Sequence, residues 1–195
     1  AIPSQPNSSE DLSVKVEMKD AQTPSLCRYS SIVELRKKHN ASFRWQPLAL
    51  SEAKPFPMST REAYQQWLFH GPLFHGISEI HQIGANGING ILIPSSPKKL
   101  LAGDPQGTWL IDPVIVDSGL QMIILWSRTY WDMMPLPSRF QQFRSFGPLS
   151  GSKIRFQSRI LPNSTPGMLH ADLAFFNEQG KLIALLEDME AACSK

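Results

Sequence analysis

The sequence contains little that would support a disulfide-bonded, metal-binding or membrane-spanning protein. Only two of its 195 residues are cysteines, Cys27 and Cys193, so a disulfide framework is excluded and no metal-type cysteine spacing is present. The longest apolar stretch, near residues 120–126, is far shorter than the roughly 20 residues that cross a bilayer. The N-terminus lacks the charged start and apolar block of a signal peptide. We therefore expect a cytoplasmic protein without a membrane span.

Charge and motif content exclude further classes. The 19 Lys and Arg residues nearly balance the 17 Asp and Glu residues, which leaves a net charge of +2. No basic run is interleaved with aromatic residues, so no nucleic-acid partner is expected. The motifs of serine hydrolases, P-loop proteins and dinucleotide-binding folds are missing. Because His70, His75 and His81 lack a companion cysteine or carboxylate cluster at ligand spacing, we expect no metal.

The first 60 residues have the character of a lead-in. The segment LSVKVEM alternates apolar and polar residues, which predicts a half-buried strand, and RYSSIVEL predicts a second one. The segment ALSEAKPFPMST is typical of a linker, and Ser59 or Thr60 is placed to cap the short helix that follows. We therefore divide the chain into residues 1–60 and a domain of residues 61–195. The start at Ala1 rather than Met is consistent with a piece of a longer chain or a processed product.

The second part predicts an α+β fold, with one buried helix followed by a run of strands. From Ser118 to Tyr130 no residue breaks a helix except Gly119 near its start, and apolar residues occupy most of its faces. Such a helix should be largely enclosed. Four strand candidates with turn signals between them follow the helix. We expect an antiparallel sheet of five to seven strands around this helix.

Asp117 and Gln121 are the first candidates for chemistry. They lie four residues apart, and therefore on one face of the predicted helix. A carboxyl group near a helix N-terminus feels the positive end of the helix dipole, and a neighbouring amide can hold it by hydrogen bonding. The alternative is that Asp117 is simply the N-cap of the helix. Asp112, which precedes Pro113, has the pattern of an ordinary turn former.

His70 and His75 are the second pair of candidates. Both lie in the segment HGPLFHGI, which predicts a loop entering a strand. Histidine is the side chain best suited to proton transfer near neutral pH. The alternative is that each is a hydrogen-bonded surface or packing residue.

Taken in order, these stretches resemble the dehydratase domains of polyketide and polyunsaturated-fatty-acid synthases, specifically the C-terminal half of such a domain. The resemblance rests on HGPLFHGI at 70–77, GILIP at 90–94 and DPVIVDSGLQ at 112–121, with later strands that also match. It covers residues 64–192. The resemblance implies a hot-dog fold, in which a long helix is wrapped by an antiparallel sheet.

The resemblance also implies an activity. Dehydratases of this family fuse two hot dogs, of which the first carries a histidine in an HxxxGxxxxP motif and the second carries an aspartate. They remove water from a β-hydroxyacyl thioester held on the phosphopantetheine of an acyl carrier protein, and need no other cofactor. By this likeness Asp117 is the acid and Gln121 orients it, while Gly71, Pro72 and Phe74 shape the pocket wall.

The departures from the family pattern leave the source of the base open. No HxxxGxxxxP motif occurs, and His70 and His75 stand where the family often has Tyr and Gln. A second hot dog, in cis or as a dimer, would supply the histidine, or one of these two substitutes for it. We assign His75 to catalysis and His70 to substrate binding. We therefore expect the chain alone to be an incomplete catalytic half, with the acyl carrier protein and other synthase domains as partners.

Two further functions remain. A non-catalytic hot dog would bind or shape a growing acyl chain within a large synthase. A product-template cyclase or a thioesterase is the third possibility, although a cyclase would also need a His/Asp pair.

Overall fold

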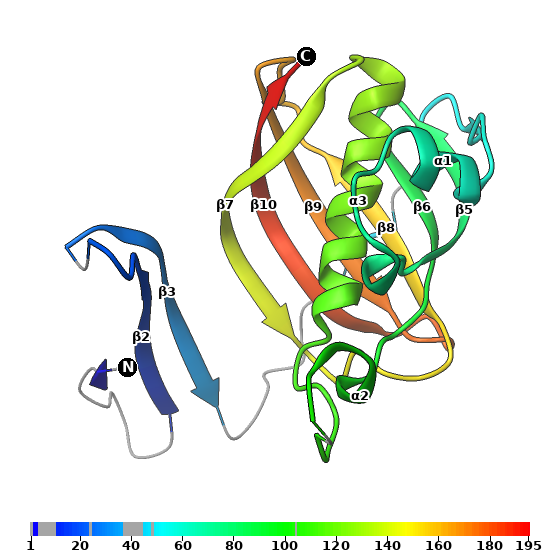
Figure 1. Ribbon diagram of the computed structural model, residues 1–195. Coiled ribbons are helices and arrows are strands. Elements are labelled where there is room, and N and C mark those ends of the chain that lie inside the picture. The colour runs from blue at the N-terminus through cyan, green and yellow to red at the C-terminus, as the bar shows by residue number, and fades with distance from the viewer. Residues whose placement is uncertain (1, 4–10, 24, 37–44, 48, 104) are drawn as a thin grey trace. The chain divides into compact units, whose positions relative to one another are not determined.

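The computed structural model describes residues 2–3, 11–23, 25–36, 45–47, 49–103 and 105–195 (Figure 1). The chain falls into two units, residues 1–43 and 44–195. The segment before residue 60, which the sequence analysis grouped with the lead-in, lies with the second unit. There, strand β4 (Lys54–Pro55) pairs with the larger sheet and Phe56 is buried in the core. The domain boundary at residue 60 stays a prediction.

The first unit is a small antiparallel sheet. It contains β1 (Ile2–Pro3), β2 (Asp11–Lys19) and β3 (Cys27–Arg36), in that order across the sheet. Strands β2 and β3 confirm the two strands expected from the alternating pattern. The turn between them is held by Asp20, whose carboxylate accepts hydrogen bonds from two turn amides and pairs with Arg28 at 2.7 Å.

The second unit contains a seven-stranded sheet in which every neighbouring pair is antiparallel. Its order is β4-β5-β6-β8-β9-β10-β7. The strands are β4, β5 (Ile77–Gly84), β6 (Gly87–Leu92), β7 (Met134–Ser145), β8 (Ile154–Ile160), β9 (Met168–Phe176) and β10 (Leu182–Ser194). The four expected late strands are therefore β7 to β10, and the strand number lies within the predicted range.

Four helical segments accompany this sheet. They are α1 (Thr60–Gln66), the 3-10 turn η1 (Pro72–Phe74), α2 (Pro97–Leu100) and α3 (Pro113–Tyr130). Helix α1 begins as predicted, because the Ser59 hydroxyl accepts from the Glu62 amide while the Glu62 carboxylate accepts from the Ser59 amide. None of the helices in the described part of the chain is long and apolar enough to span a membrane.

The core lies between α3 and the sheet, which curls around the helix (Figure 1). Helix α3 contacts β5, β6, β7 and β8, and most of its side chains are buried. At Gly119 the helix comes so close to the sheet that an added Cβ atom would lie 2.8 Å from the ring of Phe175. An enclosed helix wrapped by an antiparallel sheet is the α+β hot-dog arrangement that the resemblance implied.

The central helix begins earlier than predicted, at Pro113 rather than Ser118. Proline suits the first helical position, because its fixed φ fits the helix and its missing N–H would have no partner there. Asp112, interpreted from sequence as a turn former, is the N-cap and accepts from the amides of Val114 and Ile115. The N-cap interpretation of Asp117 is therefore wrong, since Asp117 lies one turn inside the helix.

Asp112 also links the start of α3 to Ser95 by hydrogen bonds. Its carboxylate accepts from the amide of Ser95 at 2.6 Å and from the hydroxyl of Ser95 at 2.8 Å. The Ser95 hydroxyl in turn accepts from the indole N–H of Trp109. Because Asp112 is only 1% exposed, its removal would leave several buried donors without an acceptor.

Replacing this cap should lower stability. We expect Asp112→Ala to reduce the free energy of unfolding by about 2 kcal/mol, because the cap and the bonds to Ser95 are lost together. Asp112→Asn keeps one acceptor oxygen and should cost less. Urea denaturation of the two variants beside the unmodified chain measures the difference. An Asp112→Ala variant as stable as the unmodified chain would contradict the capping role.

Candidate active site

Helix α3 brings Asp117 and Gln121 together, as their spacing predicted. The amide Nε2 of Gln121 donates to Asp117 Oδ2 at 2.7 Å and to the carbonyl oxygen of Phe74 at 2.9 Å. Gln121 is completely buried, whereas the Asp117 side chain keeps 28% of its surface exposed. The amide is thus a fixed part of the interior, and the carboxyl group that it holds faces accessible space.

His70 is the histidine that the structure places beside Asp117. Its Nε2 lies 3.5 Å from Asp117 Oδ2, and its side chain is only 13% exposed. The ring stacks on Phe69, and Nδ1 is buried without a hydrogen-bond partner among the described residues. Burial lowers the pKa of His70; the nearby Asp117 works against this shift and His75 adds to it. The imidazole therefore favours its neutral form.

His75 occupies a different position. Its Nε2 donates to the carbonyl oxygen of His70 at 2.9 Å, and its ring stacks on Tyr64 at 3.9 Å between centroids. It is an exposed residue and does not line the pocket described below. The catalytic role assigned to His75 stays a prediction, but the observed contacts are those of a residue that supports its neighbours.

A pocket of about 340 Å³ opens beside the Asp117 and His70 side chains. Apart from these two, all of its lining side chains are apolar. The lining residues are Phe69, His70, Phe74, Asp117, Leu120, Ile124, Pro135, Leu136 and Pro137. Such an apolar pocket with a few convergent polar groups is typical of small-ligand sites.

The pocket wall differs in part from the predicted one. Phe74 lines it as expected, but Gly71 and Pro72 do not: Pro72 instead begins the exposed turn η1. The sequence did not predict that the start of β7, from Pro135 to Pro137, also lines the pocket. The start of β7 reaches the pocket because β7 pairs with β10 at the edge of the sheet. No short sequence motif predicts this long-range pairing.

Tyr64 is the polar residue of the site that the sequence analysis overlooked. Its hydroxyl donates to Gln121 Oε1 at 2.8 Å and accepts from the amide of Ile77 at 3.0 Å. Burial raises the pKa of Tyr64 to about 12, although the Ile77 amide works against the shift. The available signal was its place on the capped helix α1, just before the histidine segment.

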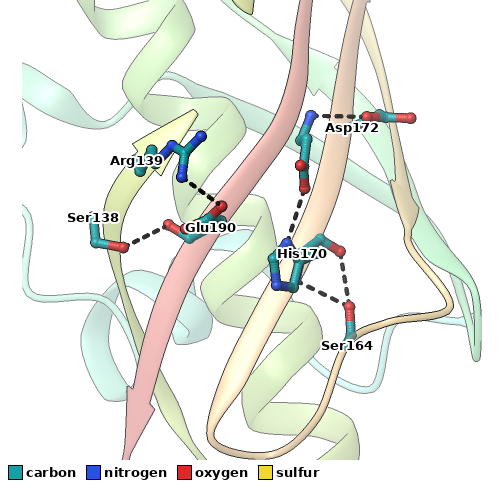
Figure 2. A network of polar contacts seen from close by, with 7 residues as sticks. Ser138, Arg139, Ser164, His170, Asp172 and Glu190 are labelled. Carbon is teal, nitrogen blue, oxygen red and sulfur yellow. Dashed lines mark hydrogen bonds and ion pairs between the residues drawn. The ribbon is translucent and has the colours of Figure 1, made fainter. Parts of the chain in front are cut away.

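A second polar cluster lies on β9 and β10 (Figure 2). A bulge in β10 gives Asp188 a left-handed backbone, φ 45°, and its carboxylate meets His170 Nδ1 at 2.9 Å. With Glu190 these residues place three possible metal-ligand atoms within 4.8 Å of one another. Glu190, however, is paired with Arg139 at 3.6 Å.

Comparison with known proteins identifies the family. Among curated proteins, none is significantly similar in sequence. A family model described as "Polyketide synthase dehydratase N-terminal domain" matches residues 47–194, which is well over half of the chain. The chain belongs to the polyketide synthase dehydratase family. That the chain corresponds to the C-terminal half of a dehydratase, as its motifs suggested, stays a prediction.

Solved dehydratase domains share the fold. The dehydratase domain of PpsC from Mycobacterium tuberculosis gives a TM-score of 0.65 at 16% identity, over 97% of this chain and 66% of that one. That of RzxB from Pseudomonas fluorescens gives 0.64 at 16% identity, with the same coverage. The dehydratase domain from the CurJ module of the curacin polyketide synthase gives 0.56 at 17%, over 71% of this chain and 50% of that one. This dehydratase-family chain therefore spans about half to two thirds of their length.

The burial of His70 has a measurable consequence for stability. Because the pKa of folded His70 lies below its ordinary value of 6.5, the unfolded chain binds a proton at this residue first. Stability should therefore fall as the pH drops through 6.5, and this loss should end below the folded-state pKa. Urea unfolding from about pH 8 to about pH 5 tests this, with His70→Gln expected to remove that part of the pH dependence. The more exposed His81 provides the matched control, His81→Gln.

The same shift can be observed directly. An NMR titration of the imidazole nitrogens should give His70 a midpoint below 6.5 in the folded protein. A midpoint at or above that value would show that burial does not dominate at this position.

Proposed function

We propose that the second unit is a dehydratase that removes water from β-hydroxyacyl thioesters carried on the phosphopantetheine of an acyl carrier protein. The observation that carries this proposal is the pairing of His70 Nε2 with Asp117 Oδ2, 3.5 Å apart, at an apolar pocket. An elimination needs one group to take a proton and another to give one. The pair offers both groups from a single chain.

In this proposal burial suits His70 to be the base, and the family resemblance assigns the role of acid to Asp117. Neutral His70 takes the α-proton of the thioester, and the C–H electron pair forms the new double bond. Asp117, as the acid, gives its proton to the β-hydroxyl, so that the C–O bond breaks and water leaves. The reaction leaves an imidazolium beside a carboxylate, and their closeness allows the proton to return from His70 to Asp117.

The rest of the pocket suits the acyl chain. Phe74, Leu120 and Ile124 offer apolar surface next to the Asp117 carboxyl group. Gln121 holds that carboxyl group from inside the helix, which is the orienting role that the family resemblance implied. The partners in this proposal are the acyl carrier protein and the other domains of a synthase.

A second function is favoured by a specific observation. The chain lacks the HxxxGxxxxP histidine and spans only about half to two thirds of the dehydratase domains it matches. In this alternative a second hot dog, in cis or as a dimer, supplies the base, or the domain only binds and shapes acyl chains. His70 would then contribute to the pocket wall without taking a proton.

Turnover measurements separate these possibilities. Although the sequence favoured an incomplete half, with His70 as the base we expect the purified chain to convert a β-hydroxyacyl-pantetheine thioester to the conjugated enoyl product. The reaction is followed by the ultraviolet absorbance of that product. Asp117→Asn and His70→Gln should each lower kcat by about 100-fold or more, because each removes one proton-transfer group. His81→Gln is the control and should retain most activity, since this histidine is exposed on β5 and does not line the pocket.

Each contrary result has a clear meaning. Activity that survives His70→Gln would remove His70 from the mechanism. Activity that appears only after addition of a histidine-bearing hot dog would favour the half-site alternative. Tight acyl-pantetheine binding without turnover under either condition would favour the non-catalytic function.

A further inference from the structure

A chain of hydrogen bonds runs from the backbone of β5 to Asp117. The amide of Ile77 donates to the Tyr64 hydroxyl, and that hydroxyl donates to Gln121 Oε1. The Nε2 of Gln121 then donates to Asp117 Oδ2 and to the carbonyl oxygen of Phe74. Every polar atom of the buried Gln121 side chain therefore has a partner.

The direction of this hydrogen-bond chain is set from both ends of the Gln121 amide, by the Phe74 carbonyl oxygen, which can only accept, and by the Tyr64 hydroxyl, which has a proton to give. A hydroxyl group has one proton, and because the Ile77 amide already donates to Tyr64 Oη, that proton is available for the amide oxygen of Gln121. The reversed amide would turn Oε1 toward the carbonyl oxygen of Phe74 and the carboxyl group of Asp117. It would leave the amide protons facing a hydroxyl that already accepts one bond.

The reversed amide would also change what Asp117 can do. A protonated Asp117 would donate to Gln121 Oε1, and its proton would point into the helix packing instead of into the pocket. With the observed orientation the amide can only donate to Asp117, so the acid proton stays available to a ligand. The Tyr64–Gln121 bond, together with the Phe74 carbonyl oxygen, thus stabilises the amide orientation that leaves the acid proton available to a ligand.

We infer that Tyr64 is a positioning residue for Asp117, acting through the orientation of the Gln121 amide. The catalytic part of this inference rests on the proposed dehydratase function, whereas the amide orientation does not. Tyr64 does not line the pocket, so its effect is exerted through Gln121 and not on the substrate.

The surroundings of Tyr64 fit this task. The residue lies on α1, whose start is fixed by the Ser59 and Glu62 capping box, and its ring is stacked on His75. Burial raises the pKa of Tyr64 to about 12, so the hydroxyl keeps its proton over the whole physiological range. By stacking on the Tyr64 ring, His75 would help to hold that ring in place without contacting the reacting groups.

Tyr64→Phe is the discriminating variant, because it keeps the ring and its stacking and removes only the hydroxyl. We expect kcat to fall about tenfold with KM changed less than about twofold, since the loss concerns the acid and not acyl binding. The control is Tyr130→Phe, on a tyrosine that stacks on Trp126 and does not line the pocket. It should leave both constants unchanged.

A double-mutant cycle separates positioning from a merely structural role. In a Gln121→Ala background the amide no longer exists, so Tyr64→Phe should add less than about a twofold further loss in kcat. An effect of the same size in both backgrounds would overturn the inference, because Tyr64 would then act independently of Gln121.

A readout independent of activity keeps the inference testable if the chain proves inactive. The two Gln121 amide protons should give separate, slowly exchanging NMR signals, with Overhauser contacts to Asp117. In Tyr64→Phe they should exchange faster and lose those contacts, whereas in Tyr130→Phe they should not change. Unchanged Gln121 signals in Tyr64→Phe would overturn the inference. Changed signals in a chain without turnover would support amide positioning and contradict the proposal that this chain alone carries out the dehydration.

Discussion

The hydrogen bonding of the buried Gln121 amide is the interaction on which the rest of the site depends. A polar side chain with no exposed surface must find partners inside the protein, or its burial costs free energy. Its partners come from three separate elements: Tyr64 from α1, the Phe74 carbonyl oxygen from η1, and Asp117 from α3 itself. Satisfying one amide therefore couples the positions of all three elements, and with them the walls of the pocket.

The enclosed helix supplies the second constraint. Because α3 is buried on most of its circumference, its rotation about its own axis is determined by packing against β5, β6 and β8. Close approach of the sheet at Gly119 leaves little freedom for that rotation. Asp117 then faces the pocket that His70, Phe74 and the start of β7 also line. The location of the site is thus a consequence of core packing.

Local patterns were sufficient to predict most of the fold. The alternation in β2 and β3, the cap of α1, the apolar central helix and the late strands were all visible in short segments of sequence. The start of α3 lies five residues before the predicted Ser118, because proline is favoured at the first helical position and Pro113 occupies it. With the helix starting at Pro113, Asp112 is its N-cap and Asp117 lies inside the first turns.

The site was harder to predict, because its parts meet only in three dimensions. The Asp117–Gln121 pair follows from helical spacing and was expected. Residue spacing does not show which of His70 and His75 lies beside Asp117, since both lie in the same short segment. The path of the backbone places His70 next to Asp117 and turns His75 toward the His70 carbonyl oxygen. Tyr64 and the start of β7 belong to the site through long-range packing that no short motif encodes.

The central claim is that His70 is the base of an acid–base pair contained in this chain. The most direct test is deuterium exchange at the α-carbon of a saturated acyl-pantetheine thioester, which has no β-hydroxyl to lose and so needs only the base. In D₂O, mass spectrometry should show α-deuteration by the unmodified chain and by Asp117→Asn, but not by His70→Gln. Undiminished exchange in His70→Gln would contradict the account.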